Sequence, residues 1–186
     1  MTENSDRFFV VTGGPGAGKT TLIDALARLG YARSVEAGRA IIQDQLAIRG
    51  RALPWCDPAM FTEMMLSWEM RSYRLACEEA GPVFFDRGIP DLAGYLRLVG
   101  LPVPAHVEKA VETFRYNRRV FLAPLWPEIY TQDSERKQTL EEAGRTQDAL
   151  ARKYNEYGYE LVTIPRAPVA ERVRFVLTQA GLSVDA

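Results

Sequence analysis

The sequence predicts an α/β fold in which a mostly parallel β-sheet is covered by helices on both faces. Two observations support this prediction. Short apolar runs typical of buried strands recur along the chain at residues 8–12, 34–36, 83–86, 120–123 and 160–164. Segments with a helical spacing of apolar residues fill the intervals between these runs. Such alternation of strands and helices is typical of the units that build a parallel sheet.

Length and composition set the size and class of the protein. The chain has 186 residues, of which 47% are hydrophobic, so it is long enough for one sizeable core and short for two. We therefore expect a single domain over residues 1–186, without internal repeats. The net charge of −1 provides no basic footprint for nucleic acid or for an anionic membrane. A small molecule is the expected partner.

Cysteine content and hydropathy indicate the compartment. The chain contains only Cys56 and Cys77, which are too few for a disulfide framework and lack metal-ligand spacing. No apolar segment has the length of a signal peptide core or a membrane span. We expect a cytoplasmic protein with reduced cysteines and no membrane partner.

The first strand-like run leads directly into a glycine-rich loop that fits the pattern G-x-x-x-x-G-K-[ST] without departure. Its residues are Gly13, Gly14, Pro15, Gly16, Ala17, Gly18, Lys19, Thr20 and Thr21. Glycines let the backbone N–H groups surround phosphates, and the positive end of the following helix adds to the attraction. Lys19 is expected to contact the β- and γ-phosphates, and the Thr20 hydroxyl to ligate Mg²⁺. The loop therefore predicts a bound nucleoside triphosphate.

Terminal residues locate the helices. The helix after the loop has an apolar face and ends at Gly30. The longest helix is predicted to begin at the N-cap Asp57, with Pro58 at its first position, and to end at Gly81. We interpret its apolar stripe as core; the stripe consists of Phe61, Met64, Met65, Trp68, Ser72, Leu75 and Ala76. A capping box, Thr139-x-x-Glu142, predicts the next helix, which ends at Gly158, and the last helix runs from about Val169 to Gly181.

Residues 124–138 interrupt the alternation with two prolines and many charged side chains. A long irregular segment after a strand is often a mobile lid, and we expect a lid over approximately residues 124–145. Arg136 is the best candidate for an arginine that closes over the phosphates, and Lys137 and Arg145 are weaker ones. The alternative is a solvated charged face.

The third strand-like run ends in a carboxylate and a guanidinium, Asp86 and Arg87. Ligands of open α/β folds bind at this carboxyl edge of the sheet. Asp86 either binds Mg²⁺ through water or accepts the proton of an attacking hydroxyl, and Arg87 would bind a phosphate. Asp91 either caps a helix or contacts acceptor hydroxyls. The alternative for the Asp-Arg pair is a structural turn.

A second carboxylate and guanidinium, Glu36 and Arg39, follow the second strand-like run. Their spacing of three residues places both on one helix face, where both would reach the same acceptor, although an exposed ion pair is the alternative. Trp55 and Trp126 lie near irregular segments, and we favour packing over stacking on a base for both.

Missing motifs narrow the choice of nucleotide-binding class. The chain has no guanine-reading Asn-Lys-x-Asp motif, and its third strand-like run does not end in the acidic pair of a mechanical ATPase. A kinase that transfers the γ-phosphate of ATP to a nucleoside-like or other small acceptor fits best. A nucleoside monophosphate kinase and an ATP-dependent switch are the alternatives.

Several motifs in order resemble a known family. They are the phosphate loop, Val35-Glu36-x-x-Arg39, Phe85-Asp86-Arg87-Gly88-x-x-Asp91, Asp133-Ser-Glu-Arg136, Tyr154-x-x-x-Gly158-Tyr159 and Val162-x-x-Pro165. The set resembles the ribosylnicotinamide-kinase-like group of AAA-type P-loop ATPase domains, within the nucleoside and nucleotide kinase clan. This resemblance implies a three-layer α/β/α sandwich with a five-stranded parallel sheet, and ATP with Mg²⁺ as donor. It further implies acceptor contacts by Glu36 and Arg39, a reacting centre near Asp86 and Arg87, and a lid carrying Arg136.

Overall fold

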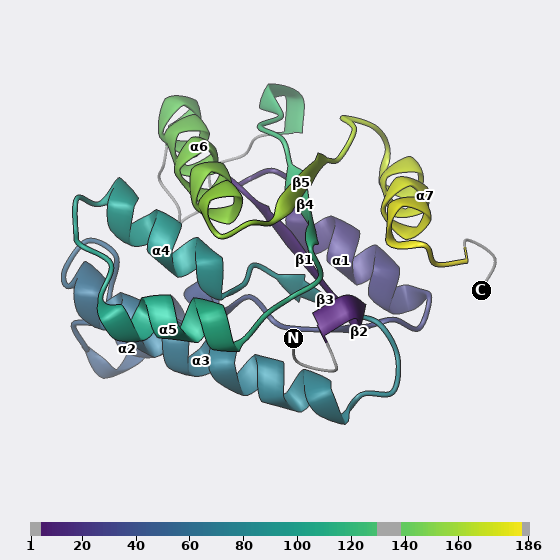
Figure 1. The fold of residues 1–186 in the computed structure, drawn as a ribbon. Coiled ribbons are helices and arrows are strands. Elements are labelled where there is room, and N and C mark those ends of the chain that lie inside the picture. The colour runs from purple at the N-terminus through teal and green to yellow at the C-terminus, as the bar shows by residue number, and fades with distance from the viewer. Residues whose placement is uncertain (1–4, 130–138, 184–186) are drawn as a thin grey trace.

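A computed structural model describes residues 5–129 and 139–183 of the chain. Five parallel strands form one sheet in the order β2-β3-β1-β4-β5. Helices lie on both faces of this sheet (Figure 1). The predicted three-layer α/β/α fold with a five-stranded parallel sheet is therefore confirmed. β1 occupies the centre, so the loop that follows it emerges at the middle of the carboxyl edge.

The strands are short and, apart from the second, lie where the apolar runs predicted them. They are β1 (Phe8–Gly13), β2 (Ala32–Arg33), β3 (Val83–Asp86), β4 (Arg119–Ala123) and β5 (Glu160–Thr163). The prediction of a strand at residues 34–36 was wrong, because β2 ends at Arg33 and only the Ser34 N–H continues the ladder by donating to the Phe84 carbonyl (3.0 Å). Residues 34–36 instead lead the chain into the next helix.

The described residues also form seven helices and two short 3₁₀ segments. The helices are α1 (Lys19–Arg28), α2 (Ala37–Ile48), α3 (Pro58–Glu78), α4 (Ile89–Leu98), α5 (Ala105–Thr113), α6 (Leu140–Glu156) and α7 (Val169–Ala180). The 3₁₀ segments are η1 (Ser5–Arg7) and η2 (Pro127–Ile129). In this part of the chain, no helix is long and apolar enough to cross a membrane.

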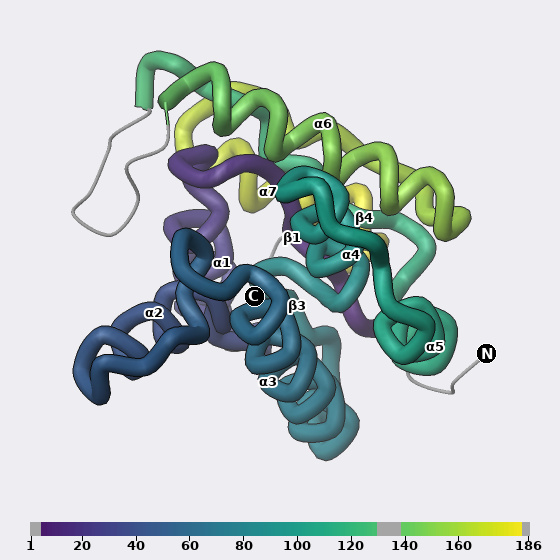
Figure 2. The backbone as a smooth tube through the Cα atoms, turned by 90° about the vertical axis from the view of Figure 1, so that its left-hand side faces the viewer, coloured from purple at the N-terminus to yellow at the C-terminus, as the bar shows by residue number. Residues whose placement is uncertain are grey.

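Two hydrophobic clusters fill the space between the layers. Phe8 and Val10 of β1 join the cluster under α2 to α6, whereas Phe9 and Val11 join the cluster under α1 and α7. Successive strand residues point to opposite faces, so this strand is buried on both sides. Figure 2 shows α1, α4 and α6 packed around β1. The core thereby holds the phosphate loop and the first turn of α1 in a rigid frame.

The longest helix, α3, starts as predicted, and its buried face matches the predicted stripe in part, since Phe61, Met65 and Ala76 are buried. The Asp57 side chain accepts a hydrogen bond from the Met60 N–H (2.9 Å), and the helix ends at Glu78 rather than Gly81. Met64 and Leu75, which we predicted to be core residues, are 36% and 50% exposed. The buried face of α3 packs against α2 and α4, and it includes Leu66, Glu69 and Tyr73 instead.

The capping box of α6 is confirmed. Thr139 Oγ1 accepts from the Glu142 N–H (3.2 Å), while Glu142 Oε2 accepts from the Thr139 N–H (2.6 Å). The helix therefore begins inside the segment that we predicted as a lid, and residues 140–145 form its first turns. Arg136 and Lys137 lie outside the described residues, so their lid role stays a prediction.

Candidate active site

The phosphate loop closes tightly between β1 and α1. Gly13 has a φ of 134°, and a Cβ at this position would overlap the carbonyl of Ala123 on β4. Gly18, the N-cap residue of α1, has a φ of 71°. Both conformations favour glycine, because L-residues with side chains rarely adopt positive φ. The glycines thus let the loop turn back over the start of its own helix.

Lys19 and Thr20 occupy the first turn of α1. Lys19 is 5% exposed, and its Nζ donates to the carbonyls of Gly13 (3.2 Å) and Gly14 (2.8 Å). The Thr20 hydroxyl donates to Asp86 Oδ2 (3.1 Å), which joins the loop to the end of β3. The structure therefore brings together the lysine, the hydroxyl and the carboxylate that the sequence assigned to one site.

Asp86 is a buried carboxylate with an unpaired oxygen. Its side chain is 2% exposed, its N–H donates to Ser34 Oγ (3.0 Å), and Oδ1 has no hydrogen-bond partner among the described residues. Burial raises the pKa of Asp86, and Glu36 adds to this rise, whereas Lys19 opposes it. An oxygen-only pair of Thr20 and Asp86 fits the ligand preference of Mg²⁺. Residues 5–129 and 139–183 contain no cluster of three His, Cys, Asp or Glu side chains able to hold a metal; Mg²⁺ at phosphates needs only one or two such side chains.

Arg87 lies between two carboxylates. It has a φ of 74°, unusual for a residue with a side chain, and its N–H donates to the Val11 carbonyl (3.0 Å). Its guanidinium contacts Asp91 (Nη1 to Oδ1, 3.1 Å) and Glu36 (Nε to Oε1, 3.8 Å). Burial would lower the pKa of Arg87, but the charges of Asp91, Glu36 and Asp86 raise it. The arginine is thus fully charged and largely neutralised by its neighbours.

Asp91 organises this group of side chains. Its Oδ2 accepts from the Gly88 N–H (3.0 Å), which caps α4, and from the Tyr154 hydroxyl (2.5 Å). Its Oδ1 accepts from the Thr12 hydroxyl (2.6 Å) as well as from Arg87. Of the two predicted roles, helix capping is observed, and an acceptor contact stays a prediction.

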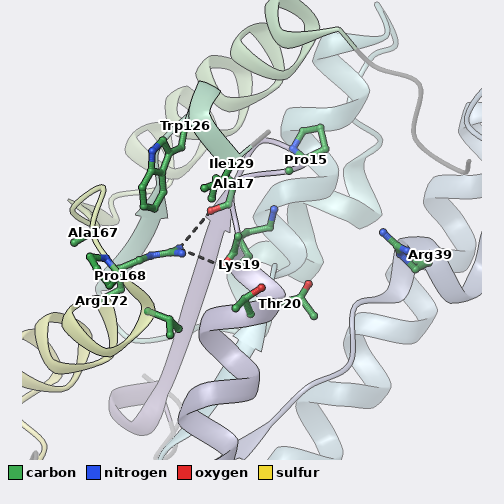
Figure 3. A pocket seen from close by; sticks show the side chains of 14 residues that line it. Pro15, Ala17, Lys19, Thr20, Arg39, Trp126, Ile129, Ala167, Pro168 and Arg172 are labelled. Atoms are coloured by element: carbon green, nitrogen blue, oxygen red, sulfur yellow. Dashed lines mark hydrogen bonds between the residues drawn. The ribbon is translucent and has the colours of Figure 1, made fainter. Parts of the chain in front are cut away.

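The loop borders a first cavity of about 480 Å³. Besides residues 15–21, it is lined by Arg39, Trp126, Ile129, Ala167, Pro168, Val169 and Arg172. Figure 3 shows Arg39 and Arg172 on opposite sides of the loop, with Trp126 next to Arg172. The charged side chains of this wall, Lys19, Arg39 and Arg172, are all cations. We refer to it as the loop cavity.

Arg172 is a site residue that we did not predict. Its Nη2 donates to the carbonyls of Ala17 (3.3 Å) and Gly18 (3.2 Å), and its Cζ lies 5.9 Å from the centre of the Trp126 ring (Figure 3). Burial lowers the pKa of Arg172. The available signal was an arginine four residues before Val176, on the apolar face of the last helix. Its contact with Gly18, 154 residues earlier in the chain, cannot be predicted from any local sequence pattern.

A second cavity, of about 330 Å³, lies beside the loop and is mostly apolar. Its lining includes Ile42, Pro54, Trp55, Phe61, Met65, Tyr95 and Leu150, together with Glu36, Arg87, Asp91, Glu142 and Thr146. Pro15 lines both cavities, so they meet at the phosphate loop. We refer to this one as the acidic cavity, because its described lining residues include three carboxylates and a single arginine.

The structure separates one predicted pair and places three further candidate residues. Glu36 is the N-cap residue of α2 and lines the acidic cavity, whereas Arg39, one turn later, lines the loop cavity. Trp126 lines the loop cavity, and Trp55, 61% exposed, lines the acidic cavity. Arg145 borders neither; it lies on α6 in a surface groove with Arg97 and Arg152.

A sequence profile of an AAA domain family matches residues 8–172. The chain belongs to this AAA domain family. The match covers the phosphate loop, both cavities and Arg172, and it confirms the resemblance to P-loop ATPase domains. No curated protein sequence gives a significant match.

Solved kinase structures share the fold of this AAA domain. NadR in complex with NR aligns with a TM-score of 0.73 and 18% identity, over 97% of this chain and 53% of the NadR chain. A deoxyadenosine kinase from M. mycoides aligns with a TM-score of 0.65 and 14% identity, over 94% of this chain and 98% of the kinase chain. A thymidylate kinase from Ehrlichia chaffeensis aligns with a TM-score of 0.60 and 14% identity, over 96% of this chain and 100% of the kinase chain. The chain spans about half the length of NadR, and identities this low establish the fold alone.

Proposed function

We propose that this AAA domain is a kinase that transfers the γ-phosphate of ATP to a hydroxyl group of a nucleoside-like small molecule. The observation that carries this proposal is the meeting of the two cavities at Pro15 of the phosphate loop. A triphosphate in the loop cavity would present its terminal phosphate to a molecule in the acidic cavity. Phosphoryl transfer mainly requires such in-line positioning together with charge stabilisation.

Each side chain has a role in this proposal. The acceptor oxygen attacks the γ-phosphorus, the bond from that phosphorus to the β–γ bridging oxygen breaks, and ADP leaves. Glu36, which lines the acidic cavity, accepts the proton of the attacking hydroxyl. Lys19 and Arg87 stabilise the charge of the migrating phosphoryl group. Thr20 and Asp86 would hold Mg²⁺, which neutralises phosphate charge when bound.

The charge of the acidic cavity favours an acceptor that carries no phosphate. Among its described lining residues the cavity has three carboxylates, Glu36, Asp91 and Glu142, and one cation, Arg87, which already contacts two of these carboxylates. A nucleoside monophosphate would bring two more negative charges to these groups, and like charges in a partly buried site repel strongly. An uncharged or cationic nucleoside meets no such penalty. We therefore favour a nucleoside kinase over a nucleoside monophosphate kinase.

A phosphorylation screen tests the proposal. The protein is incubated with ATP and Mg²⁺ and with nucleosides, nucleoside monophosphates, sugars or other small metabolites, and the products are identified by mass spectrometry. We expect a phosphorylated nucleoside that disappears with Lys19→Ala. Phosphorylation of monophosphates alone would favour the monophosphate kinase. Slow release of ADP without any phosphorylated product would favour an ATP-dependent switch.

A further inference from the structure

Tyr95 projects from α4 into the acidic cavity. It lies four residues after Asp91, so the two side chains are on the same face of the helix, about 6 Å apart along its axis. Its ring packs edge-to-face against Phe61, with ring centres 5.9 Å apart. Glu36, Arg87 and Asp91 thus form the polar end of the cavity, and Tyr95 and Phe61 line it one helical turn away.

The Tyr95 hydroxyl is buried and has no hydrogen-bond partner among the residues that the structure describes. The buried Tyr73 and Tyr154 do have partners: Tyr73 donates to the Arg115 carbonyl (2.7 Å) and Tyr154 donates to Asp91. The hydroxyl of the half-buried Tyr157 also lacks a hydrogen-bond partner among the described residues, but Tyr157 lines neither cavity. An unpaired buried hydroxyl destabilises a fold, so its presence on a residue that lines a cavity calls for an explanation. Burial raises the pKa of Tyr95 to about 12, so the hydroxyl keeps its proton and remains a donor.

We propose that Tyr95 determines acceptor specificity by donating a hydrogen bond to a carbonyl oxygen or ring nitrogen on the base of a nucleoside. The inference rests on the proposed kinase function and extends it. The apolar side chains of Phe61, Met65 and Leu150 enclose an aromatic ring, while the carboxylate end of the cavity receives the sugar hydroxyl. The unpaired hydroxyl then supplies the directional contact that the apolar walls lack. The predicted substrate class is an uncharged or cationic nucleoside whose base carries a hydrogen-bond acceptor on its edge.

The test combines Tyr95→Phe with acceptor analogues. Steady-state kinetics are measured for a nucleoside that the wild-type protein phosphorylates and for analogues lacking one acceptor atom of the base. Suitable pairs are inosine and purine riboside, uridine and pyrimidin-2-one riboside, adenosine and its deaza analogues, and nicotinamide riboside and pyridine riboside. We expect Tyr95→Phe to lower kcat/KM for the parent about 5- to 30-fold, mainly through KM. For the analogue that lacks the paired atom we expect a change of less than about twofold, because the contact is already absent.

Tyr73→Phe is the matched control, since it removes a hydroxyl that is hydrogen-bonded away from both cavities. It should lower the melting temperature and leave acceptor KM unchanged. Tyr95→Phe should leave the melting temperature and the KM for ATP at or near wild-type values, because no protein partner loses a hydrogen bond.

Two results would overturn the inference in distinguishable ways. Equal losses for parent and analogues, or no loss for any nucleoside that is phosphorylated, would reject the role of Tyr95 while the kinase function stands. If the wild-type protein phosphorylates no nucleoside, the proposed function fails first and the role of Tyr95 fails with it.

Discussion

The loop cavity and the acidic cavity share Pro15 but differ in charge and in origin. The loop cavity is lined by backbone N–H groups and by Lys19, Arg39 and Arg172, without a carboxylate among its described lining residues. The part of the acidic cavity formed by described residues has three carboxylates, one arginine and a mostly apolar wall. Two adjoining sites of opposite character favour different ligands, because a polyanion is attracted to the first and repelled by the second. The contrast indicates how one AAA domain would hold a triphosphate in the loop cavity and an uncharged acceptor in the acidic cavity.

We expect the largest effect from a substitution that removes Lys19, the lysine of the loop cavity. Lys19→Ala should lower turnover with ATP and any accepted nucleoside about 100- to 1,000-fold, because the lysine stabilises charge that develops during transfer. Steady-state kinetics measure the loss, and thermal unfolding checks that the fold remains. Lys109→Ala is the control, since Lys109 is exposed and contacts only Glu112 among the described partners. Near-normal turnover in Lys19→Ala would reject the assigned role.

The second effect tests whether Arg172 belongs to the loop cavity. Arg172→Ala should raise the KM for ATP about 5- to 30-fold, because it removes a buried cation and two hydrogen bonds that hold the loop carbonyls. The acceptor KM should not change. Arg174→Ala, an exposed position on the same helix, should behave like the wild type. A rise in the acceptor KM, without a rise in the KM for ATP, would contradict the assignment of Arg172 to the loop cavity.

The third effect belongs to the acidic cavity. Trp55→Ala should raise the acceptor KM about fivefold, since an aromatic contact with a ligand contributes about 1 kcal/mol. The KM for ATP should stay constant, and Ile48→Ala serves as a control on another exposed apolar side chain. If the acceptor KM is unaffected, Trp55 does not contact the bound molecule.

We expect the smallest effect from substituting Glu69, a buried carboxyl near Asp86 and Asp91, and this effect is on stability. Glu69 of α3 is 2% exposed, and its burial, followed by the charges of Asp91 and Asp86, raises its pKa. A raised folded-state pKa gives stability that is complete below the ordinary value of 4.5 and is lost as the pH rises through the folded value. Glu69→Gln cannot ionise, so it should be more stable than the wild type at neutral and alkaline pH, by about 1 kcal/mol or a few degrees in melting temperature.

Thermal unfolding measured between about pH 4 and pH 9, the range in which a carboxyl with a raised pKa titrates, tests this difference. The gain should vanish toward the acid end. Glu78→Gln, an exposed position on the same helix, should follow the wild type throughout. A constant difference across the pH range would mean that ionisation of Glu69 is not its cause.

Much of the fold was predictable because its signals are local. The glycine pattern of the phosphate loop, the Asp57 cap and the Thr139–Glu142 capping box depend on contacts within a few residues, and the structure contains all three. The α/β class followed from the alternation of apolar runs with helical periods. The exact burial of α3 did not follow, since Met64 and Leu75 have the right spacing but are exposed, whereas Leu66 and Tyr73 are buried.

The fold class, the phosphate loop and the carboxylate and arginine at the end of β3 could all be read from local patterns in the sequence. Tertiary structure decided which cavity each side chain faces. It separated Glu36 from Arg39, brought Arg172 to the loop and left the hydroxyl of Tyr95, which lines the acidic cavity, without a partner among the described residues. The physical reason is that a cavity wall is assembled from segments distant in sequence. Their meeting depends on how helices pack over the whole sheet, and no short pattern encodes that packing.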